Sequence, residues 1–247
     1  MIFRYQELEN FLKKLAVYNK VSSFKEMENE KQGTILRHDV DADVKAAFNI
    51  VQIEKSINVK STLFFLTSSP CYNVNTFNNR KLIRKIAEDG FEVGLHLDLL
   101  VYPHLKEDED FELVALKEAS ILEDIIGVKI ETYSIHNPSI HGQYPSFKTL
   151  RNAYASKFFK PELYLSDSRM NFRGKDPFEF AKLAINNLIQ VTLHPIHFSE
   201  SGGGYEMIFK EYIGRVISDI DENFRSVNKY YVEALENKTL ISLVQNK

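Results

Sequence analysis

The stretch RHDVD, residues 37–41, places four ionisable side chains directly after a short apolar run. Because side chains two positions apart in a strand share a face, Asp39 and Asp41 would point the same way, with Arg37 behind them. Two carboxylates with imidazoles nearby suit a divalent cation such as zinc. Two structural alternatives stay open: Asp41 or Asp43 could cap the helix that follows, and Arg37 could pair with Asp39. Without partners, burying these groups would cost several kcal/mol.

Other apolar runs along the chain also end in acidic or imidazole side chains. His96 and Asp98 close the run at 91–97, and His136 closes the run that starts at residue 131. A single histidine in such a place is commonly a buried core residue, but here the pattern repeats with Asp167, His194 and His197. At the carboxyl ends of barrel strands, side chains of this kind converge on an active site. An open doubly wound sheet would instead spread them along one edge.

Strand-like and helix-like segments must hold these side chains, and they alternate along almost the whole chain. The expected strands are 33–39, 61–66, 91–97, 131–138, 163–169 and 188–195, with 155–159 as a seventh. The expected helices are 5–19, 42–58, 79–90 and 107–127, followed by a long C-terminal helical region over 205–236. Alternation of this kind within one domain, residues 1–247, predicts parallel strands with helices outside them.

Composition and charge limit the classes of function. The 247 residues are 44% hydrophobic, which is enough for one large domain with a full core. The net charge of −3 provides no field that would attract nucleic acid or an anionic membrane. Cys71 is the single cysteine, so a reducing compartment is expected. The N-terminal residues do not read as a signal peptide, and no apolar run approaches the ~18 residues of a membrane span. We therefore expect a cytoplasmic protein without an integral membrane span.

Six segments, in order, carry a resemblance to a known family: LRHDVDAD, KSTLFFL, EDGFEVGLHLD, SIHNPS, YLSDSR and VTLHPIHF. With them the sequence resembles the polysaccharide deacetylase (NodB-homology, carbohydrate esterase 4-like) superfamily. It is most similar to the divergent branch found in bacterial surface-glycan and O-antigen biosynthesis. The resemblance implies a single-domain distorted (β/α) barrel of about seven parallel strands with outer helices. It also implies metal-dependent hydrolysis of an N-acetyl or related amide on a sugar.

The resemblance gives roles to residues of the first two motifs. By position, Asp39 matches the general base and Asp41 a metal ligand. The family's two aspartates are adjacent, whereas here Val40 separates them, so the two roles could be exchanged. His96 matches the first ligand histidine of the second motif. The second ligand histidine of the family falls at Leu100, whose side chain cannot bind a metal.

Asp98 and His136 are the candidates for the missing third ligand. The family places an arginine in its third motif where this sequence has His136. A neutral imidazole can bind a metal and a guanidinium cannot, so His136 could compensate for Leu100. The expected cofactor is one divalent ion, with zinc as the first candidate and nickel, cobalt or manganese as alternatives.

The last two motifs supply the acid side of the implied reaction. His194 matches the histidine that protonates the leaving amine. Asp167 matches an acidic residue that orients another catalytic side chain. His197 is an additional histidine that could contact substrate. The residues expected in substrate-binding or supporting roles are Arg37, Asp98, Asp167, Arg169 and His197.

Three functions remain open. The first is a metal-dependent hydrolase that removes an N-acyl group, with N-acetyl as the first candidate. Its substrate would be an amino sugar on a nucleotide or lipid carrier in bacterial surface-glycan biosynthesis. The second is a non-catalytic homologue that binds little or no metal, for which Leu100 argues. The third is a metal-dependent phosphoesterase on a similar barrel, which would favour two metals and more than the seven histidines present. No nucleic-acid partner is expected, and no oligomeric state is predicted.

Overall fold

A computed structural model describes residues 3–235 and 238–245 of the chain. Contacts within the chain group it into two compact units, Met1–Gly202 and Gly203–Lys247. The first unit contains the six motifs, and the second contains the C-terminal helices. The expectation that residues 1–247 form a single domain stays a prediction.

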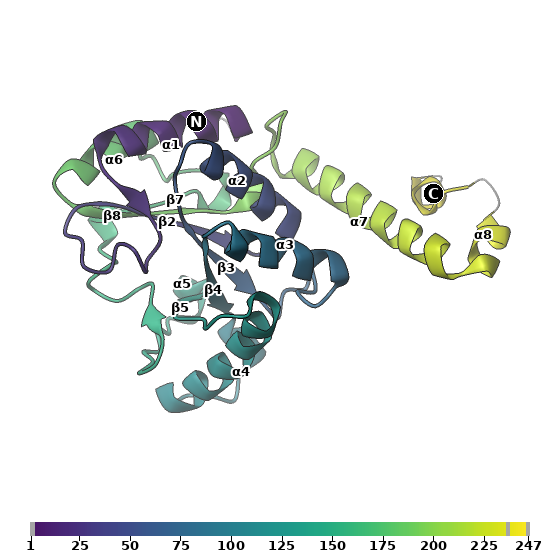
Figure 1. Ribbon diagram of the computed structural model, residues 1–247, viewed down its shortest axis with the longest axis horizontal. Coiled ribbons are helices and arrows are strands. Elements are labelled where there is room, and N and C mark those ends of the chain that lie inside the picture. Colours follow the sequence, from purple (N-terminus) through teal and green to yellow (C-terminus); the bar gives the residue numbers. More distant parts are fainter. Residues whose placement is uncertain (1–2, 236–237, 246–247) are drawn as a thin grey trace. The chain divides into compact units, whose positions relative to one another are not determined.

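Seven parallel strands of the first unit form one curled sheet, in the order β6-β5-β4-β3-β2-β8-β7. A short additional strand, β1, pairs with β2 outside this path. The sheet curls into a half-barrel with helices around its outside, which confirms the expected distorted (β/α) barrel (Figure 1). The strands are β1 (Val21–Ser22), β2 (Gly33–Val40), β3 (Thr62–Leu66), β4 (Glu92–Leu97), β5 (Thr132–Ile135), β6 (Arg151–Asn152), β7 (Tyr164–Ser166) and β8 (Leu188–Leu193).

The strand expected at 155–159 is wrong, because this segment forms turns. The seventh strand of the path is β6, immediately before it, which pairs with β5. The apolar side chains of 155–159 pack into the core instead. Phe158 is buried, and its ring meets that of Phe24 edge to face at a centroid distance of 5.2 Å. Both belong to a cluster that includes Phe64 of β3. The segment is apolar because it fills this cluster and not because it pairs as a strand.

Helices cover the outer face of the sheet (Figure 1). The four long helices of the first unit are α1 (Tyr5–Tyr18), α2 (Val44–Ser56), α3 (Phe77–Glu88) and α4 (Asp108–Ile126). Each contacts the next, so together they form a belt. The left-handed Gly127 ends α4, as its position in the sequence predicts. The shorter elements are α5 (Pro138–His141), α6 (Pro177–Ala181) and the 3-10 turns η1 (Leu99–Val101), η2 (Pro161–Leu163), η3 (Ser168–Met170), η4 (Lys182–Ile185) and η5 (Pro195–His197).

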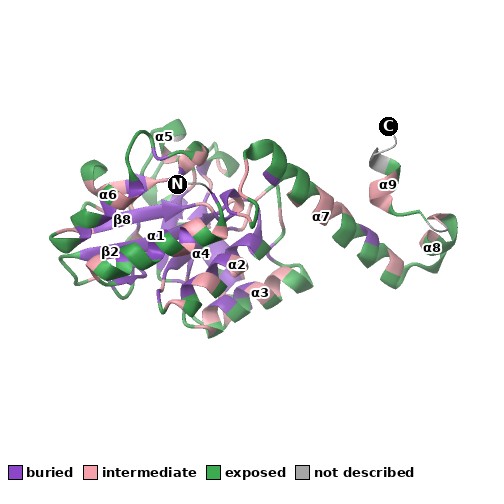
Figure 2. Cartoon of the chain, turned by 90° about the horizontal axis from the view of Figure 1, so that it is seen from above, coloured by how far each residue is buried: buried purple, intermediate pink, exposed green. Residues whose placement is uncertain are grey.

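Alternation along β2 sends neighbouring side chains to opposite faces of the sheet. On β2, Val40 belongs to the apolar cluster under the helices, whereas Arg37 and Asp39 point to the inner face. Figure 2 shows the sheet as a largely buried layer. The outer face also holds a fully buried polar pair, in which His38 Nε2 lies 2.6 Å from Glu54 Oε1 of α2. Polar side chains are thus buried on both faces of β2.

The second unit consists of helices. α7 (Tyr205–Val227) contacts both α8 (Lys229–Leu235) and α9 (Leu240–Gln245). Asp221 of α7 accepts a hydrogen bond from Tyr231 Oη at 2.7 Å and pairs with Arg225 Nε at 3.1 Å. The predicted helical region 205–236 corresponds to α7 and α8, and its last residue lies outside the described residues. None of the described helices is both long and apolar enough to span a membrane.

Candidate active site

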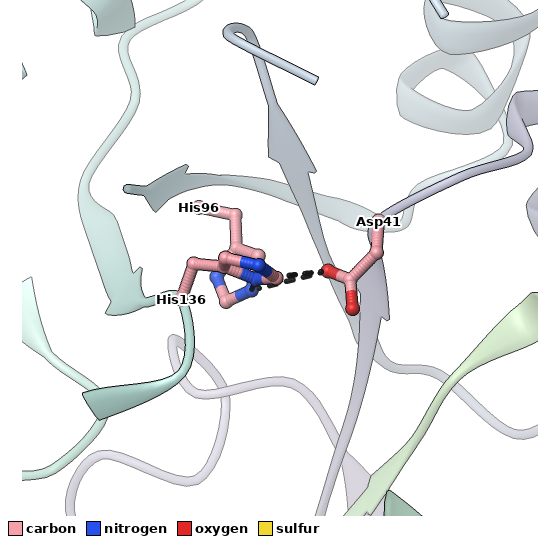
Figure 3. A group of neighbouring side chains, drawn as sticks. All are labelled: Asp41, His96 and His136. Carbon is pink, nitrogen blue, oxygen red and sulfur yellow. Dashed lines mark hydrogen bonds and ion pairs between the residues drawn. The ribbon is translucent and has the colours of Figure 1, made fainter. Parts of the chain in front are cut away.

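Three side chains from different strand ends converge on a small triangle of donor atoms (Figure 3). Asp41 follows β2, His96 lies near the end of β4, and His136 follows β5. Asp41 Oδ1 lies 3.3 Å from His96 Nε2 and 3.4 Å from His136 Nδ1. The two imidazole nitrogens are 3.2 Å apart. The structure thus brings His136, and not Asp98, to the two residues that the first motifs predict as ligands.

The size and chemistry of this triangle fit a divalent cation. Ligand atoms at 2.0–2.1 Å from a tetrahedral zinc ion lie about 3.3–3.4 Å from one another, which matches the spacing of these three atoms. Two imidazole nitrogens and a carboxylate oxygen are also a donor set that zinc accepts. Asp41 Oδ1 is buried and has no hydrogen-bond partner among the described residues. Both imidazoles lie at ion-pair distance from this oxygen.

Local capping explains why two neighbouring aspartates lie outside the triangle. Asp43, and not Asp41, caps α2, because its side chain accepts a hydrogen bond from the Lys45 backbone N–H at 2.9 Å. Asp98 caps the turn η1 in the same way, by accepting from the Leu100 N–H at 2.9 Å. The Leu100 side chain, which stands where the family has a ligand histidine, is 64% exposed.

Asn137 is a neighbour of the triangle that sequence reasoning missed. Its side-chain amide nitrogen lies 2.8 Å from His136 Nε2, the ring nitrogen that does not face Asp41. The backbone of Asn137 is left-handed (φ 46°, ψ 46°), a conformation that asparagine tolerates better than most residues. Pro138 then begins α5. The available signal was an asparagine followed by a proline at the end of a strand, since asparagine and proline both favour a turn.

Asp39 lies beside the triangle and is held by Arg37 from the same strand. Arg37 Nε donates to Asp39 Oδ1 at 3.0 Å, and Nη2 donates to Oδ2 at 2.7 Å. Asp39 Oδ2 also lies 3.9 Å from His96 Nε2. Burial alone would raise the pKa of Asp39, but the guanidinium of Arg37, together with the imidazoles of His96 and His194, holds this pKa below its ordinary value. Asp39 is thus ionised near neutral pH.

Arg37 is the centre of a polar network on the inner face of the sheet. Its guanidinium is fully buried and donates to Gln190 Oε1 at 3.2 Å, to Tyr154 Oη at 3.3 Å and to Ser134 Oγ. Sequence reasoning missed all three partners. Strand periodicity was the available signal for Gln190. This residue of β8 stands four positions before His194, so the two side chains are expected on the same face of the sheet.

Asp167, just after β7, holds two histidines that follow β8. Asp167 Oδ1 lies 2.6 Å from His194 Nδ1, and Oδ2 lies 3.0 Å from His197 Nδ1. The backbone N–H of His194 donates to both carboxylate oxygens at 3.1 Å. The other ring nitrogen, His194 Nε2, lies 3.8 Å from Asp41 Oδ2. Asp167 therefore orients His194 toward the triangle, and His197 is buried against the same carboxylate.

The contact between Asp167 and His194 changes the pKa of both groups. Burial disfavours charge on His194, but Asp167, with smaller contributions from Asp41 and Asp39, outweighs burial and raises the pKa of His194 to about 9. Burial likewise opposes the charge of Asp167, yet the two imidazoles lower its pKa to about 2. At neutral pH the pair is therefore ionic, and His194 carries a proton on Nε2.

Asp167, His194 and His197 also meet the loose geometric requirement for a metal cluster. The 2.6 Å between Asp167 Oδ1 and His194 Nδ1 is a hydrogen-bond distance. It is shorter than the ~3.3 Å that separates two ligands of a tetrahedral zinc ion. We therefore interpret this group as hydrogen-bonded and not as a second metal site.

Backbone strain gathers in two loops beside these side chains. Among the described residues other than glycine, left-handed conformations occur at Asn58, Asn137, Arg169, Met170 and Arg173. The last three lie in the loop that follows β7, directly after Asp167. Each such residue costs roughly 1–2 kcal/mol relative to the right-handed form. Arg169, which the sequence places near the site, is exposed in this loop and makes no contact with the triangle that the structure records.

No protein-family model matches the sequence, and a search among curated proteins finds no relative. A CE4-family pseudoenzyme from Bacillus anthracis has a similar solved structure, with 15% identity over 75% of this chain and 62% of that protein, and a TM-score of 0.45. A CE4 esterase from Streptococcus mutans is 14% identical over 82% of this chain and 85% of its own, with a TM-score of 0.48.

The chitin deacetylase of the fungus Colletotrichum lindemuthianum is 14% identical over 74% of this chain and 81% of its own, with a TM-score of 0.42. The match spans less than two thirds of the Bacillus protein. At such low identity these structures do not transfer an activity to this chain.

Proposed function

We propose that the chain is a metal-dependent hydrolase that removes an N-acyl group, with N-acetyl as the first candidate, from an amino sugar. The triangle of Asp41, His96 and His136 carries the proposal. His194 Nε2 lies 3.8 Å from Asp41 Oδ2, and Asp39 Oδ2 lies 3.9 Å from His96 Nε2. The donor atoms proposed for a cation, the proposed base and the proposed acid are thus adjacent, which is the combination that amide hydrolysis requires.

The chain's own residues would divide the work as follows. A divalent cation at the triangle, with zinc as the first candidate, would polarise the amide carbonyl and acidify the attacking water. Asp39, ionised and held by Arg37, accepts a proton from that water. His194 donates its Nε2 proton to the sugar nitrogen as the C–N bond breaks, and Asp167 stabilises the protonated ring. With a metal at Nδ1, the ring of His136 would carry its hydrogen on Nε2, and Asn137 would hold the ring by accepting that hydrogen through its amide oxygen.

Two alternatives are less well supported by the geometry. A phosphoesterase of the two-metal kind would need a second cluster of ligands. The only other such cluster found among the described residues, around Asp167, is joined by hydrogen bonds of 2.6 and 3.0 Å. A non-catalytic homologue is argued from Leu100, but His136 supplies a third donor atom to the triangle.

We also propose where the reaction belongs. The substrate would be carried by a nucleotide or a lipid in bacterial surface-glycan biosynthesis, and the reaction would take place in the cytoplasm. The presence of a single cysteine, Cys71, which is exposed, supports a reducing compartment. The order of the six motifs supports the glycan pathway.

Incubation of the metal-loaded protein with N-acetylated and N-formylated sugars, free and nucleotide-linked, tests the proposal through release of acetate or formate. Asp39→Asn should retain metal and lose about 100- to 10,000-fold in turnover, because the proton acceptor is removed. His194→Gln should behave in the same way. Because Asp39→Asn also removes the charge that faces the buried Arg37, urea unfolding of the variant accompanies the assay. Loss of metal from Asp39→Asn would show that Asp39 and Asp41 have exchanged roles. Cleavage of phosphate esters, with every amide left intact, would replace the hydrolase by the phosphoesterase.

A further inference from the structure

The loop after β7 carries two arginines that the proposed reaction does not use. Arg169 and Arg173 are both exposed, and within the described part of the chain neither pairs with a carboxylate. The one recorded side-chain hydrogen bond of Arg173 runs from Nη2 to Ser168 Oγ, at 3.0 Å. Four other arginines, Arg37, Arg80, Arg151 and Arg225, lie against an acidic partner, whereas Arg4 and Arg84 donate to backbone carbonyls. Because the net charge is −3, this unpaired positive charge does not follow from a generally basic composition.

The loop holds the two arginines in a strained conformation. Arg169 has φ 62° and ψ 28°, and Met170 and Arg173 have φ 53° and 51°. Glycine would adopt these angles at little cost, so the turn itself does not require arginine at either position. Asn171 closes the loop, because its Oδ1 accepts from the Arg173 N–H at 2.9 Å and its Nδ2 donates to the Arg169 carbonyl at 3.2 Å. Strain of this kind clusters where a loop binds a ligand.

Packing also places the same loop beside Asp167 and His197. Phe172 is buried and stacks on Phe3, with ring centres 5.9 Å apart. Phe3 in turn meets the ring of His197 edge to face at 5.8 Å. The guanidinium of Arg173 is bonded to Ser168, the residue that follows Asp167. The loop is therefore fixed next to the carboxylate that orients His194.

We infer that Arg169 and Arg173 form a binding site for a phosphoryl group attached to the substrate. This inference rests on the proposed function for the identity of the substrate as an amino sugar. A guanidinium presents a planar fork of donors that matches phosphate oxygens, and Arg169 and Arg173 stand four positions apart in one loop. A nucleotide and a polyprenyl lipid carrier both present this group.

Three variants of the loop test the inference. Arg169→Gly combined with Arg173→Gly removes both guanidiniums and relieves strain, so this protein should fold. Met170→Gly relieves strain between them and keeps both arginines. Because it also removes a partly buried side chain that packs on the cluster containing Phe172, it controls for any disturbance of the loop. Inorganic pyrophosphate is titrated into metal-free protein at low salt by calorimetry. The double variant should bind it about ten- to a hundredfold more weakly than the wild type. The control should bind it as the wild type does.

The outcomes separate this inference from the proposed function. A wild type that binds no pyrophosphate, a double variant that binds it as tightly as the wild type, or an equal loss in Met170→Gly would overturn the phosphoryl site. Pyrophosphate binding that depends on the arginines supports the site even where no sugar amide is cleaved, and then only the hydrolase fails. Competition by uridine diphosphate, or by polyprenyl phosphate in detergent micelles, then distinguishes a nucleotide carrier from a lipid carrier.

Discussion

His136 is the residue on which the proposed metal site depends most. It supplies the third donor atom of the triangle, at 3.2 and 3.4 Å from the other two. His136→Ala should weaken zinc binding by more than about a hundredfold. Replacing a residue that only supports a ligand already costs ~10- to 100-fold in metal affinity. Leu100→Ala, at the position of the family's missing histidine, should leave zinc affinity unchanged. Titration against a competing chelator measures both, and equal affinity in the two variants would contradict the role of His136.

The ion pair between Asp167 and His194 makes stability depend on pH. His194 has its pKa raised from 6.5 to about 9, so its contribution is complete below pH 6.5 and is lost as the pH rises through 9. Asp167 has its pKa lowered from 3.8 to about 2, so its contribution is complete above pH 3.8 and is lost as the pH falls through 2.

We expect metal-free wild-type protein to lose on the order of 2–3 kcal/mol of unfolding free energy between pH 6.5 and 9 through this pair. Asp167→Asn should show a much shallower decline over the same range, because the raised pKa of His194 requires the carboxylate. Urea unfolding at several pH values compares the two slopes. Parallel slopes would mean that Asp167 does not hold the proton on His194.

At the scale of the elements, strand positions were the most predictable part of the fold. Apolar runs located six of the seven strands in the path, and the residues at their ends located Asp41, His96 and His194. The strand assigned to 155–159 failed because an apolar run also describes a segment that fills a core. The choice between Asp98 and His136 could not be made from spacing, since it depends on a backbone hydrogen bond from Leu100 to Asp98.

Close contact between β3 and β4 makes Gly94 a sensitive position. A Cβ atom there would lie 2.6 Å from ring carbons of Phe64 and 3.0 Å from the Thr132 carbonyl oxygen. Gly94→Ala should therefore destabilise the protein by about 1–3 kcal/mol through overpacking. Gly204→Ala is the control, because nothing lies within 4 Å of its added Cβ. Urea unfolding should separate the two variants, and equal stability would show that β3 and β4 can move apart.

At the scale of the whole molecule, residues 1–202 contain all that the proposed chemistry requires. The three clusters of buried apolar side chains extend from Phe3 to Phe198, and every residue of the proposed site lies in the same range. A chain that ends at Gly202 should fold cooperatively and bind zinc with the affinity of the full chain. Circular dichroism and zinc titration measure this. A truncated chain that does not fold would support the single domain that the sequence predicts for 1–247.

Strand β2 buries polar side chains on alternating faces: Arg37 and Asp39 on the inner face, and His38 against Glu54 on the outer face. If β2 paired one residue out of alignment during folding, every one of its side chains would change face. Arg37 would enter the apolar layer under the helices, and His38 would enter the interior of the barrel. An apolar strand that shifts in this way loses packing alone. A shifted β2 would in addition separate Arg37 and His38 from their polar partners, on both faces of the sheet. The side chains that position the proposed base therefore also disfavour a misaligned sheet.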